Sequence, residues 1–238
     1  MDALTIVYPY YREAELLAFH CGAWHGYDDE TKQRLRIIIV DDGSPDAPAL
    51  PILRGMHLGI DLQLYRVNDD LGWHIGGAKN LGMHHVQTKW AFLSDIDHLL
   101  PEAGVRTILS KEVLDERKVY LLARALHDGR RRRPHPETFV LTKALYWNMG
   151  GYDEDFCSMS GCGCINAVID RETDGREVLR DVRTLPIRGI LPDPNRDARK
   201  QERRSGAMRS AAVRAKKASG DLPSGPHDHL RFEWERLL

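Results

Sequence analysis

The sequence has few cysteines, no long hydrophobic run and almost no net charge. Three of its four cysteines lie between Cys157 and Cys164, a spacing that does not resemble an extracellular disulfide framework. No uninterrupted run of apolar residues is longer than five, whereas a membrane-spanning helix needs about 20. The first residues lack the basic and apolar regions of a secretory signal. We therefore expect a cytoplasmic protein without a transmembrane segment.

The composition is that of a folded protein with an uneven distribution of charge. Apolar residues make up 42% of the 238 residues and charged residues 29%, which excludes collagen, coiled coils and full disorder. The net charge of -1 conceals ten Lys and Arg against three Asp and Glu between Arg188 and Lys217, and four arginines at Arg130–Arg133. Such clusters bind phosphates, nucleic acid or anionic lipid, or are simply solvated. We expect an acidic body with a basic C-terminal extension over residues 188–238.

Short apolar strands alternate with helical segments in the first part of the chain. The hydrophobic pattern predicts strands at Leu4–Tyr8, Leu35–Val40, Ile60–Val67 and Trp90–Leu93, with helices at Arg12–Trp24 and Gly76–Val86. This alternation is typical of an α/β fold with a mainly parallel sheet, in which ligands bind at the carboxyl ends of the strands. In the second half we expect strands at Lys118–Ala125 and Thr138–Leu141, a helix at Lys143–Met149, and a C-terminal aromatic segment, Leu230–Trp234, that docks on the body.

Two carboxylates follow the fourth of these strands. Asp95 and Asp97 are two residues apart, so both can reach one divalent cation, and oxygen ligands suit Mg²⁺ or Mn²⁺. A metal held in this way typically bridges the phosphates of a nucleotide and neutralises a diphosphate leaving group. An isolated Asp-x-Asp often does no more than cap a turn. Its position at the end of a buried strand favours the metal site.

Two further segments also have residue types suited to a nucleotide. Asp41-Asp42-Gly43-Ser44 follows the second strand, where carboxylates accept hydrogen bonds from a uracil N–H or a ribose hydroxyl or merely shape a tight turn. Glycines at Gly76 and Gly77, at the start of a helix, allow close approach of a phosphate. Lys79 follows in the first turns and can reach an anion. Neither segment is a P-loop or a Gly-x-Gly-x-x-Gly motif.

Together these motifs resemble those of the family 2 glycosyltransferases of the GT-A fold. The family's three motifs appear here, in its order and spacing, as Val40–Ser44, Gly76–Gly82 and Leu93–Asp97. Lys79 stands where the family usually has arginine, so the charge is kept without the bidentate fork. The resemblance covers roughly residues 4 to 165, and the stretch from Met149 to Phe156 is similar to a galactosyltransferase-type C-terminal segment of the same group.

The resemblance implies a GT-A-like, Rossmann-like sheet flanked by helices in residues 1–187. Residues 1–98 would bind the nucleotide sugar and residues 99–187 the acceptor. The implied activity is that of a metal-dependent hexosyltransferase, which moves a sugar from a nucleotide sugar, by default a UDP-sugar, to a hydroxyl of a glycan, protein or nucleic acid. The implied nucleotide-sugar contacts are Tyr8, Pro9, Asp41, Asp42, Gly76, Lys79, Asn80 and Asp95. The implied ligands of Mn²⁺ or Mg²⁺ are Asp95, Asp97 and a late histidine, His229.

One feature departs from the family pattern. The family places a Glu-Asp pair, whose aspartate commonly acts as general base, within about ten residues of the Gly-Gly-Tyr-Asp-Glu-Asp-Phe segment, but Cys157–Asn166 contains no acid. Asp153 and Asp155 are the nearest carboxylates and are therefore the candidate catalytic residues, and the stereochemistry stays open. The cysteine spacing is a poor match to a zinc site.

Two alternatives compete with this interpretation. A nucleotidyltransferase would need a glycine-rich basic loop after the first strand, and Tyr8–Arg12 has no glycine. A catalytically decayed GT-A-like module would bind nucleic acid or another polyanion through its basic tail, with a steep dependence on salt.

Overall fold

The structure, a computed structural model, describes residues 1–71, 74–154, 164–191, 215, 218–219 and 230–238. Within these residues the strands form one sheet. The strands are β1 (Leu4–Tyr10), β2 (Leu35–Asp41), β3 (Asp61–Val67), β4 (Trp90–Leu93), β5 (His98–Leu99), β6 (Val119–Ala125), β7 (Arg131–Arg132), β8 (Phe139–Thr142), β9 (Arg176–Pro186) and β10 (Trp234–Arg236). Their spatial order is β10-β3-β2-β1-β4-β8-β6-β9-β5, and β7 pairs with β6.

The first four strands form the parallel centre of the sheet. β1 lies between β2 and β4, with Ile6 opposite Ile37 on one side and Phe92 on the other, and β3 pairs with β2 in the same direction. Every residue of β1 and β4 is buried. Continuous apolar runs of this kind are typical of strands that are covered on both faces, so the predicted parallel sheet is confirmed. The carboxyl ends of these strands meet at one edge.

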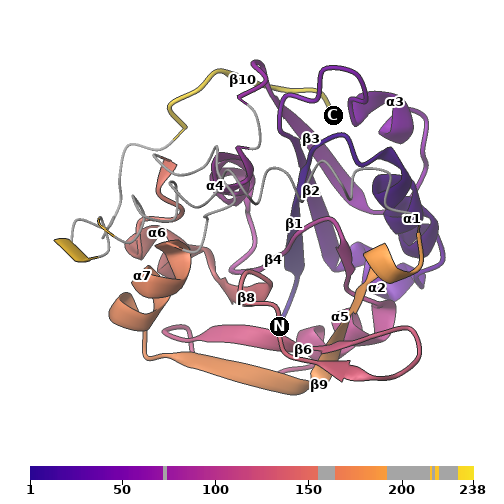
Figure 1. The fold of residues 1–238 in the computed structure, drawn as a ribbon. Coiled ribbons are helices and arrows are strands. Elements are labelled where there is room, and N and C mark those ends of the chain that lie inside the picture. The colour runs from indigo at the N-terminus through magenta and orange to yellow at the C-terminus, as the bar shows by residue number, and fades with distance from the viewer. Residues whose placement is uncertain (72–73, 155–163, 192–214, 216–217, 220–229) are drawn as a thin grey trace.

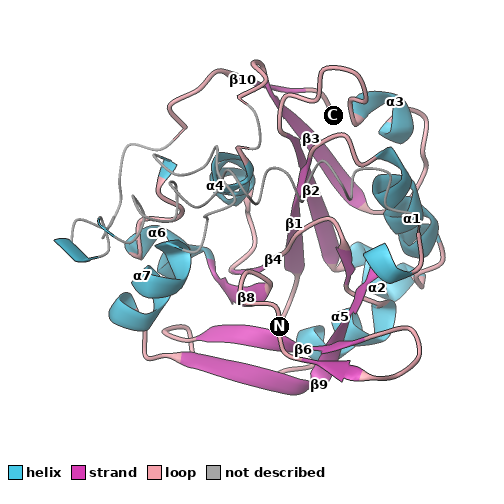
Figure 2. Cartoon of the chain, viewed as in Figure 1, coloured by secondary structure: helices cyan, strands magenta, loops and turns pink. Residues whose placement is uncertain are grey.

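Helices cover both faces of this sheet (Figures 1 and 2). One face carries α1 (Ala14–His25), α2 (Asp29–Gln33), α3 (Leu50–Leu53) and α5 (Glu102–Leu109), and the other carries α4 (Ile75–His85), α6 (Lys143–Asn148) and α7 (Cys164–Glu172). Alternate residues of β1 serve the two cores: Ile6 packs in the cluster with Trp24, and Val7 packs in the cluster with Leu81. The predicted GT-A-like α/β fold is therefore present.

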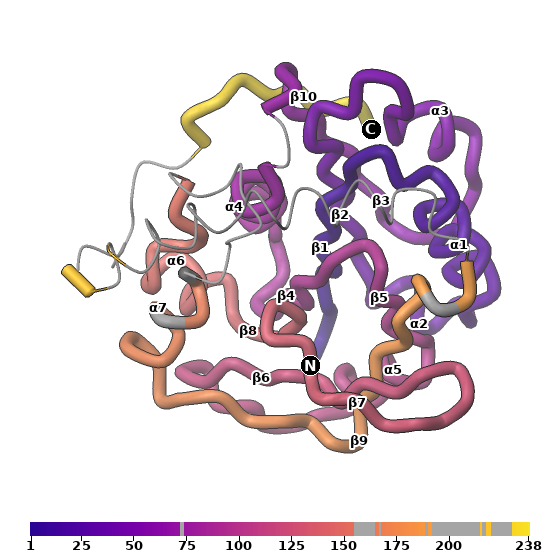
Figure 3. Tube along the Cα trace, viewed as in Figure 1, coloured from indigo at the N-terminus to yellow at the C-terminus, as the bar shows by residue number. Residues whose placement is uncertain are grey.

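The second half of the chain extends the sheet with antiparallel strands. β8 pairs with β4 and with β6, which confirms the strands predicted there, while α5, α7 and β9 were not anticipated. β9 runs parallel to β6 with a bulge between Leu122 and Ala123, and its end pairs with β5, Leu185 opposite Leu99. The traces of β5, β6, β7 and β9 can be followed in Figure 3. This pairing carries the chain after β9 back to the segment that follows Asp97.

The last described residues dock on the body, as predicted. β10 pairs with β3 in antiparallel orientation, and the ring of Trp234 packs edge-on against His85, with a centroid distance of 4.8 Å. The predicted basic extension falls mostly in residues 192–229, outside the described part of the chain except for residues 215 and 218–219. In the parts of the chain that the structure describes, no helix has both the length and the apolar character to cross a membrane.

Candidate functional site

A cavity of about 500 Å³, counted with its open mouth, lies at the carboxyl ends of β1, β2 and β4. Loops that follow these strands supply most of its walls, as expected for a parallel sheet. Acidic side chains predominate among its polar groups. The lining residues are Pro9, Tyr10, Tyr11, Glu13, Asp42, Ile75, Asp95, Ile96, Asp97 and Arg188.

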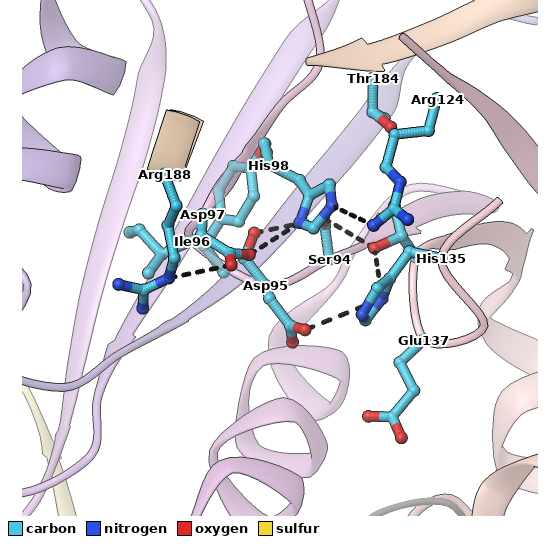
Figure 4. Close-up of polar contacts among 12 residues, drawn as sticks. Ser94, Asp95, Ile96, Asp97, His98, Arg124, His135, Glu137, Thr184 and Arg188 are labelled. Atoms are coloured by element: carbon cyan, nitrogen blue, oxygen red, sulfur yellow. Dashed lines mark hydrogen bonds and ion pairs between the residues drawn. The ribbon is translucent and has the colours of Figure 1, made fainter. Parts of the chain in front are cut away.

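Asp95 is paired with a buried lysine. Its Oδ1 lies 2.7 Å from Nζ of Lys79, a side chain with no exposed surface, and that Nζ is also 3.7 Å from Glu137 Oε2. The other oxygen of Asp95 is 3.9 Å from His135 Nδ1 (Figure 4). Burial lowers the pKa of His135, and the charge of Asp95 only partly offsets this effect. The anion that Lys79 reaches in the structure is therefore a carboxylate of the protein itself.

Asp97 lies between a histidine and an arginine (Figure 4). Its Oδ1 accepts a hydrogen bond of 2.7 Å from His98 Nδ1, and its Oδ2 accepts one of 3.0 Å from Arg188 Nε. Arg188 Nη2 also donates to Glu13 Oε1 at 2.7 Å. Burial acts to raise the pKa of Asp97, but the His98 hydrogen bond and the charges of His98 and Arg188 outweigh it and hold the pKa below its usual range. Asp97 is therefore an ionised carboxylate at neutral pH.

The backbone that carries Asp95 and Asp97 is held from three sides. The carbonyl oxygens of residues 96, 97 and 98 accept hydrogen bonds from His20 Nε2 (2.7 Å), the Ile187 N–H (2.8 Å) and the Tyr8 hydroxyl (2.9 Å). Tyr8 and His20 are fully buried, and burial lowers the pKa of His20 to about 4. Tyr8, predicted as a nucleotide contact, thus lies beneath this segment and orients it.

The two adjacent aspartates at the end of β2 differ in their surroundings. Both oxygens of Asp41 are occupied within the loop, by the N–H groups of Ser44 (2.9 Å) and Ala49 (2.8 Å). Neither oxygen of Asp42 has a hydrogen-bond partner among the described residues, although the side chain is only 1% exposed. Burial raises the pKa of Asp42 well above its usual range, and the nearby His74 N–H, which does not reach hydrogen-bond geometry, offsets this rise only in part. Asp41 shapes the turn, and Asp42 is the carboxylate that lines the cavity.

Asn80, another predicted nucleotide contact, ties α4 to the segment around residue 152. Its Oδ1 accepts bonds from the Tyr146 hydroxyl (2.5 Å) and the Tyr152 N–H (2.9 Å). Its Nδ2 donates to the Tyr152 carbonyl (3.0 Å) and to Glu154 Oε1 (2.9 Å). The side chain is fully buried. Gly76 is buried in the first turn of the same helix.

Three predicted site residues remain: Asp153, Asp155 and His229. Asp153 is 6% exposed and follows the residue that Asn80 holds. Asp155 and His229 lie outside the described residues. Glu154 accepts bonds from the N–H groups of Leu230 (2.9 Å) and Arg231 (3.1 Å), which joins this segment to the C-terminal part of the chain.

Several residues of the site were missed by sequence reasoning. Glu13, His135 and Glu137 belong to no motif, and their sequence neighbours give no pattern that would single them out. Arg188 opens the basic stretch that was attributed to a tail, and only the pairing of β9 with β5 shows that it faces Asp97. Pro9, a predicted contact of the nucleotide sugar, lines the cavity.

The sequence matches the family model described as Glycosyl transferase family 2 over residues 5–176. No curated protein matches it. Solved structures with the same fold include S. aureus TarS (TM-score 0.61, 15% identity, 77% of this chain and 36% of that chain) and its residues 1–349 in complex with UDP-GlcNAc (0.60, 14%, 77% and 58%). A third is the mannosyltransferase PcManGT from Pyrobaculum calidifontis in complex with GDP-Man and Mn²⁺ (0.61, 16%, 89% and 64%). The chain therefore spans 36% to 64% of the length of these proteins.

Proposed function

The chain belongs to glycosyl transferase family 2, and we propose that it is a glycosyltransferase whose cavity binds a nucleotide sugar, a UDP-sugar by default, and transfers the sugar to an acceptor hydroxyl. The observation that carries this proposal is the convergence of Asp42, Asp95 and Asp97, from the ends of two different strands, on one cavity. Solved structures of the same fold are complexes with UDP, UDP-GlcNAc and GDP-Man, which supports a nucleotide sugar as donor.

Asp42 is the proposed contact of the nucleoside. Its buried, unpartnered carboxylate is suited to accept a hydrogen bond from a base N–H or a ribose hydroxyl, because a bonded ligand would remove the cost of leaving both oxygens unsatisfied. Asp41 contributes indirectly, since it holds the turn that carries Asp42. Pro9 and Tyr11 line the same cavity.

Asp95 and Asp97 fit a divalent cation by the chemistry of their donor atoms. Carboxylate oxygens suit Mg²⁺ and Mn²⁺, and Mg²⁺ is often held by one or two carboxylates together with substrate phosphates. The described residues contain no group of three or more His, Cys, Asp and Glu suited to a metal, so phosphate oxygens or residues outside the described part, such as His229, would complete the ligand set. A bound metal supplies neutralisation of the diphosphate leaving group.

The protein's own groups prepare these carboxylates for that role. Lys79 fixes one oxygen of Asp95, and His98 fixes one oxygen of Asp97, while three hydrogen bonds hold the backbone that joins them. Groups held in place before the ligand arrives cost no reorganisation when charge develops. Asp153 is the proposed acceptor-side base among the described residues, and Asp155 shares that proposal.

The finer parts of the proposal rest on the sequence. The likeness of Met149–Phe156 to a galactosyltransferase-type segment, the UDP-sugar as donor, and the cytoplasmic location stay predictions. The acceptor is a glycan, a protein or a nucleic acid.

A donor screen tests the proposed function. Purified protein with Mn²⁺ is incubated with UDP-, GDP- and ADP-sugars, and the released nucleoside diphosphate is measured. We expect release from at least one donor, a loss of 100-fold or more in Asp97→Asn, and no change in Asp29→Asn, whose side chain is exposed on α2. Near-normal turnover in Asp97→Asn would remove that residue from the mechanism. Absence of release from every donor, with salt-dependent binding of nucleic acid, would overturn the proposal in favour of a polyanion-binding module.

A further inference from the structure

Arg188 is fixed to the Asp97 segment by the fold, although it lies beyond the residues that the family model matches. It sits in the short helix η2 (Ile187–Gly189) that follows β9. The N–H of Ile187, a fully buried residue, donates to the Asp97 carbonyl at 2.8 Å, and Pro186 pairs with His98. The position of Arg188 therefore follows from the sheet and does not depend on the basic segment after it.

The guanidinium of Arg188 bridges two carboxylates inside the cavity. Nε donates to Asp97 Oδ2 at 3.0 Å and Nη2 donates to Glu13 Oε1 at 2.7 Å, and the side chain is 26% exposed. Arg188 is the one Lys or Arg among the described residues that line the cavity. Lys79 has no exposed surface and is held by Asp95 and Glu137. Of these two cations, Arg188 is the one that a ligand in the cavity can reach.

A diphosphate that enters this cavity meets carboxylates on several sides. Asp42, Asp95, Asp97 and Glu13 all line it, so an anionic ligand requires cations to offset their repulsion. A guanidinium presents a planar fork of donors that matches phosphate oxygens. A divalent cation held by Asp97 would lie beside the Arg188 guanidinium, so the two positive charges would compete for the same carboxylate.

We propose that Arg188 is a ligand of the donor's diphosphate, and that it exchanges Asp97 for a phosphate oxygen when the divalent cation takes its place on Asp97. This inference rests on the proposed function and names a further donor-binding residue in it. Without a diphosphate, a metal on Asp97 would lie beside the Arg188 guanidinium, and the repulsion between the two charges would weaken both contacts with the carboxylate. The diphosphate supplies the new partner for Arg188. Metal and diphosphate therefore bind with positive coupling, which is reciprocal by linkage.

The exchange predicts effects of opposite sign from one substitution. In Arg188→Gln, Asp97 loses its competitor, so Mn²⁺ alone, followed by the electron paramagnetic resonance of the free ion, is expected to bind at least 5-fold more tightly than to wild type. The same variant loses a phosphate ligand, so UDP or GDP, whichever wild type binds, is expected to bind at least 10-fold more weakly in calorimetry at saturating Mn²⁺. The affinity for the corresponding nucleoside is expected to stay the same.

Two matched variants keep the test decisive. Arg183→Gln removes an exposed arginine of β9, the strand that precedes η2, and is expected to leave all three affinities unchanged. Arg188→Lys keeps the charge and is expected to retain part of the diphosphate affinity. A misfolded variant would lose all affinities together and could not gain affinity for Mn²⁺. If wild type turns over a nucleotide sugar while Arg188→Gln binds Mn²⁺ and the diphosphate as wild type does, the inference is wrong and the proposed function stands. A wild type that turns over no donor overturns the proposed function instead.

Discussion

Replacing Asp42 by asparagine is expected to stabilise the fold and to weaken nucleotide binding, whereas the same change at the neighbouring Asp41 is expected to destabilise the fold. The two aspartates share one turn and are almost equally buried. They differ in that Asp41 has both oxygens bonded to backbone N–H groups, and Asp42 has neither oxygen bonded within the described residues. The pair therefore separates the effect of hydrogen bonding from the effect of burial.

The expected gain at Asp42 follows from the cost of an unsatisfied buried group. Leaving such a group without a partner costs about 1–3 kcal/mol, and more when it is charged. Asparagine has nearly the same shape and carries no charge, so the free energy of unfolding should rise by about 1–2 kcal/mol. The same substitution removes the charge-assisted bond proposed for the nucleoside, which is about 1.5–3 kcal/mol or about 10- to 100-fold in Kd.

The expected loss at Asp41 follows from its two acceptor contacts. An asparagine there keeps one acceptor oxygen but turns its NH₂ group toward the second backbone N–H, either that of Ser44 or that of Ala49. One charge-assisted bond disappears and one buried N–H is left without an acceptor, so the free energy of unfolding should fall by about 3 kcal/mol.

The pH dependence of the free energy of unfolding provides a second, independent test of the Asp42 prediction. The folded pKa of Asp42 is raised, so in this respect the folded state holds a proton to higher pH than the unfolded state, whose aspartate titrates near about 3.9. The stability contributed by this proton is fully present below about pH 4 and is lost as the pH rises through the folded pKa. Asp42→Asn lacks this loss, so its advantage over wild type should grow with pH.

Urea unfolding of the three proteins between pH 4 and pH 8, with calorimetric titration of UDP or GDP at pH 7, measures both effects. An Asp42→Asn variant that is less stable than wild type at pH 7 would show that the carboxylate is satisfied in the folded protein. Unchanged affinity for the nucleoside diphosphate would remove Asp42 from the binding site.

Three further predictions concern the parts that support the site. Asn80→Ala should lower the free energy of unfolding by about 3–5 kcal/mol, because it leaves several buried groups without partners. Asn148 is exposed, so Asn148→Ala should cost less than about 0.5 kcal/mol. Similar losses for the two variants in urea unfolding would contradict the role of Asn80. Gly43→Ala should lower the free energy of unfolding by at least about 3 kcal/mol, because its φ is +70° and the new Cβ would lie 2.3 Å from a backbone oxygen. Gly55 has a φ of +81° but open space around it, so Gly55→Ala should cost only about 1–2 kcal/mol. Equal losses in the two variants would refute the steric argument. Burial lowers the folded pKa of His20 to about 4, below its usual 6.5, so protonation of the unfolded state should reduce the free energy of unfolding as the pH falls from about 6.5 to 4. His20→Phe should lack this contribution to the pH dependence of stability. Parallel stability curves for wild type and His20→Phe would refute the prediction.

The parallel strands could be predicted because their sequences allow little else. Ile37–Val40 and Trp90–Leu93 are short apolar runs that are followed by acidic turns, and burial on both faces is the arrangement that such runs favour. Because the carboxyl ends of parallel strands share an edge, the cavity near Asp42, Asp95 and Asp97 was predictable as well.

β9 could not be predicted in the same way. Its eleven residues include several exposed charges, and the bulge opposite Leu122 and Ala123 breaks the alternation by which a half-buried strand is recognised. Because β9 was missed, Arg188 appeared to belong to a basic tail. Lys79 and Asn80 on α4 were predicted as contacts of the nucleotide sugar, but the structure gives them partners within the protein, such as Glu137 for Lys79, which lie far along the chain.

The same difference explains why the carboxylates of the site were found and their counter-ions were not. An Asp-x-Asp at a strand end is a local pattern, because strand and turn place both groups. Their partners come from three separate elements: Lys79 from α4, His98 from β5 and Arg188 from η2. Among the described residues, Asp95 and Asp97 are thus paired within the protein, whereas Asp42 has no hydrogen-bond partner. A substitution at either paired aspartate also removes one of the two carboxylate partners of a cation, so its effect on turnover contains that cost in addition to any loss of metal or donor.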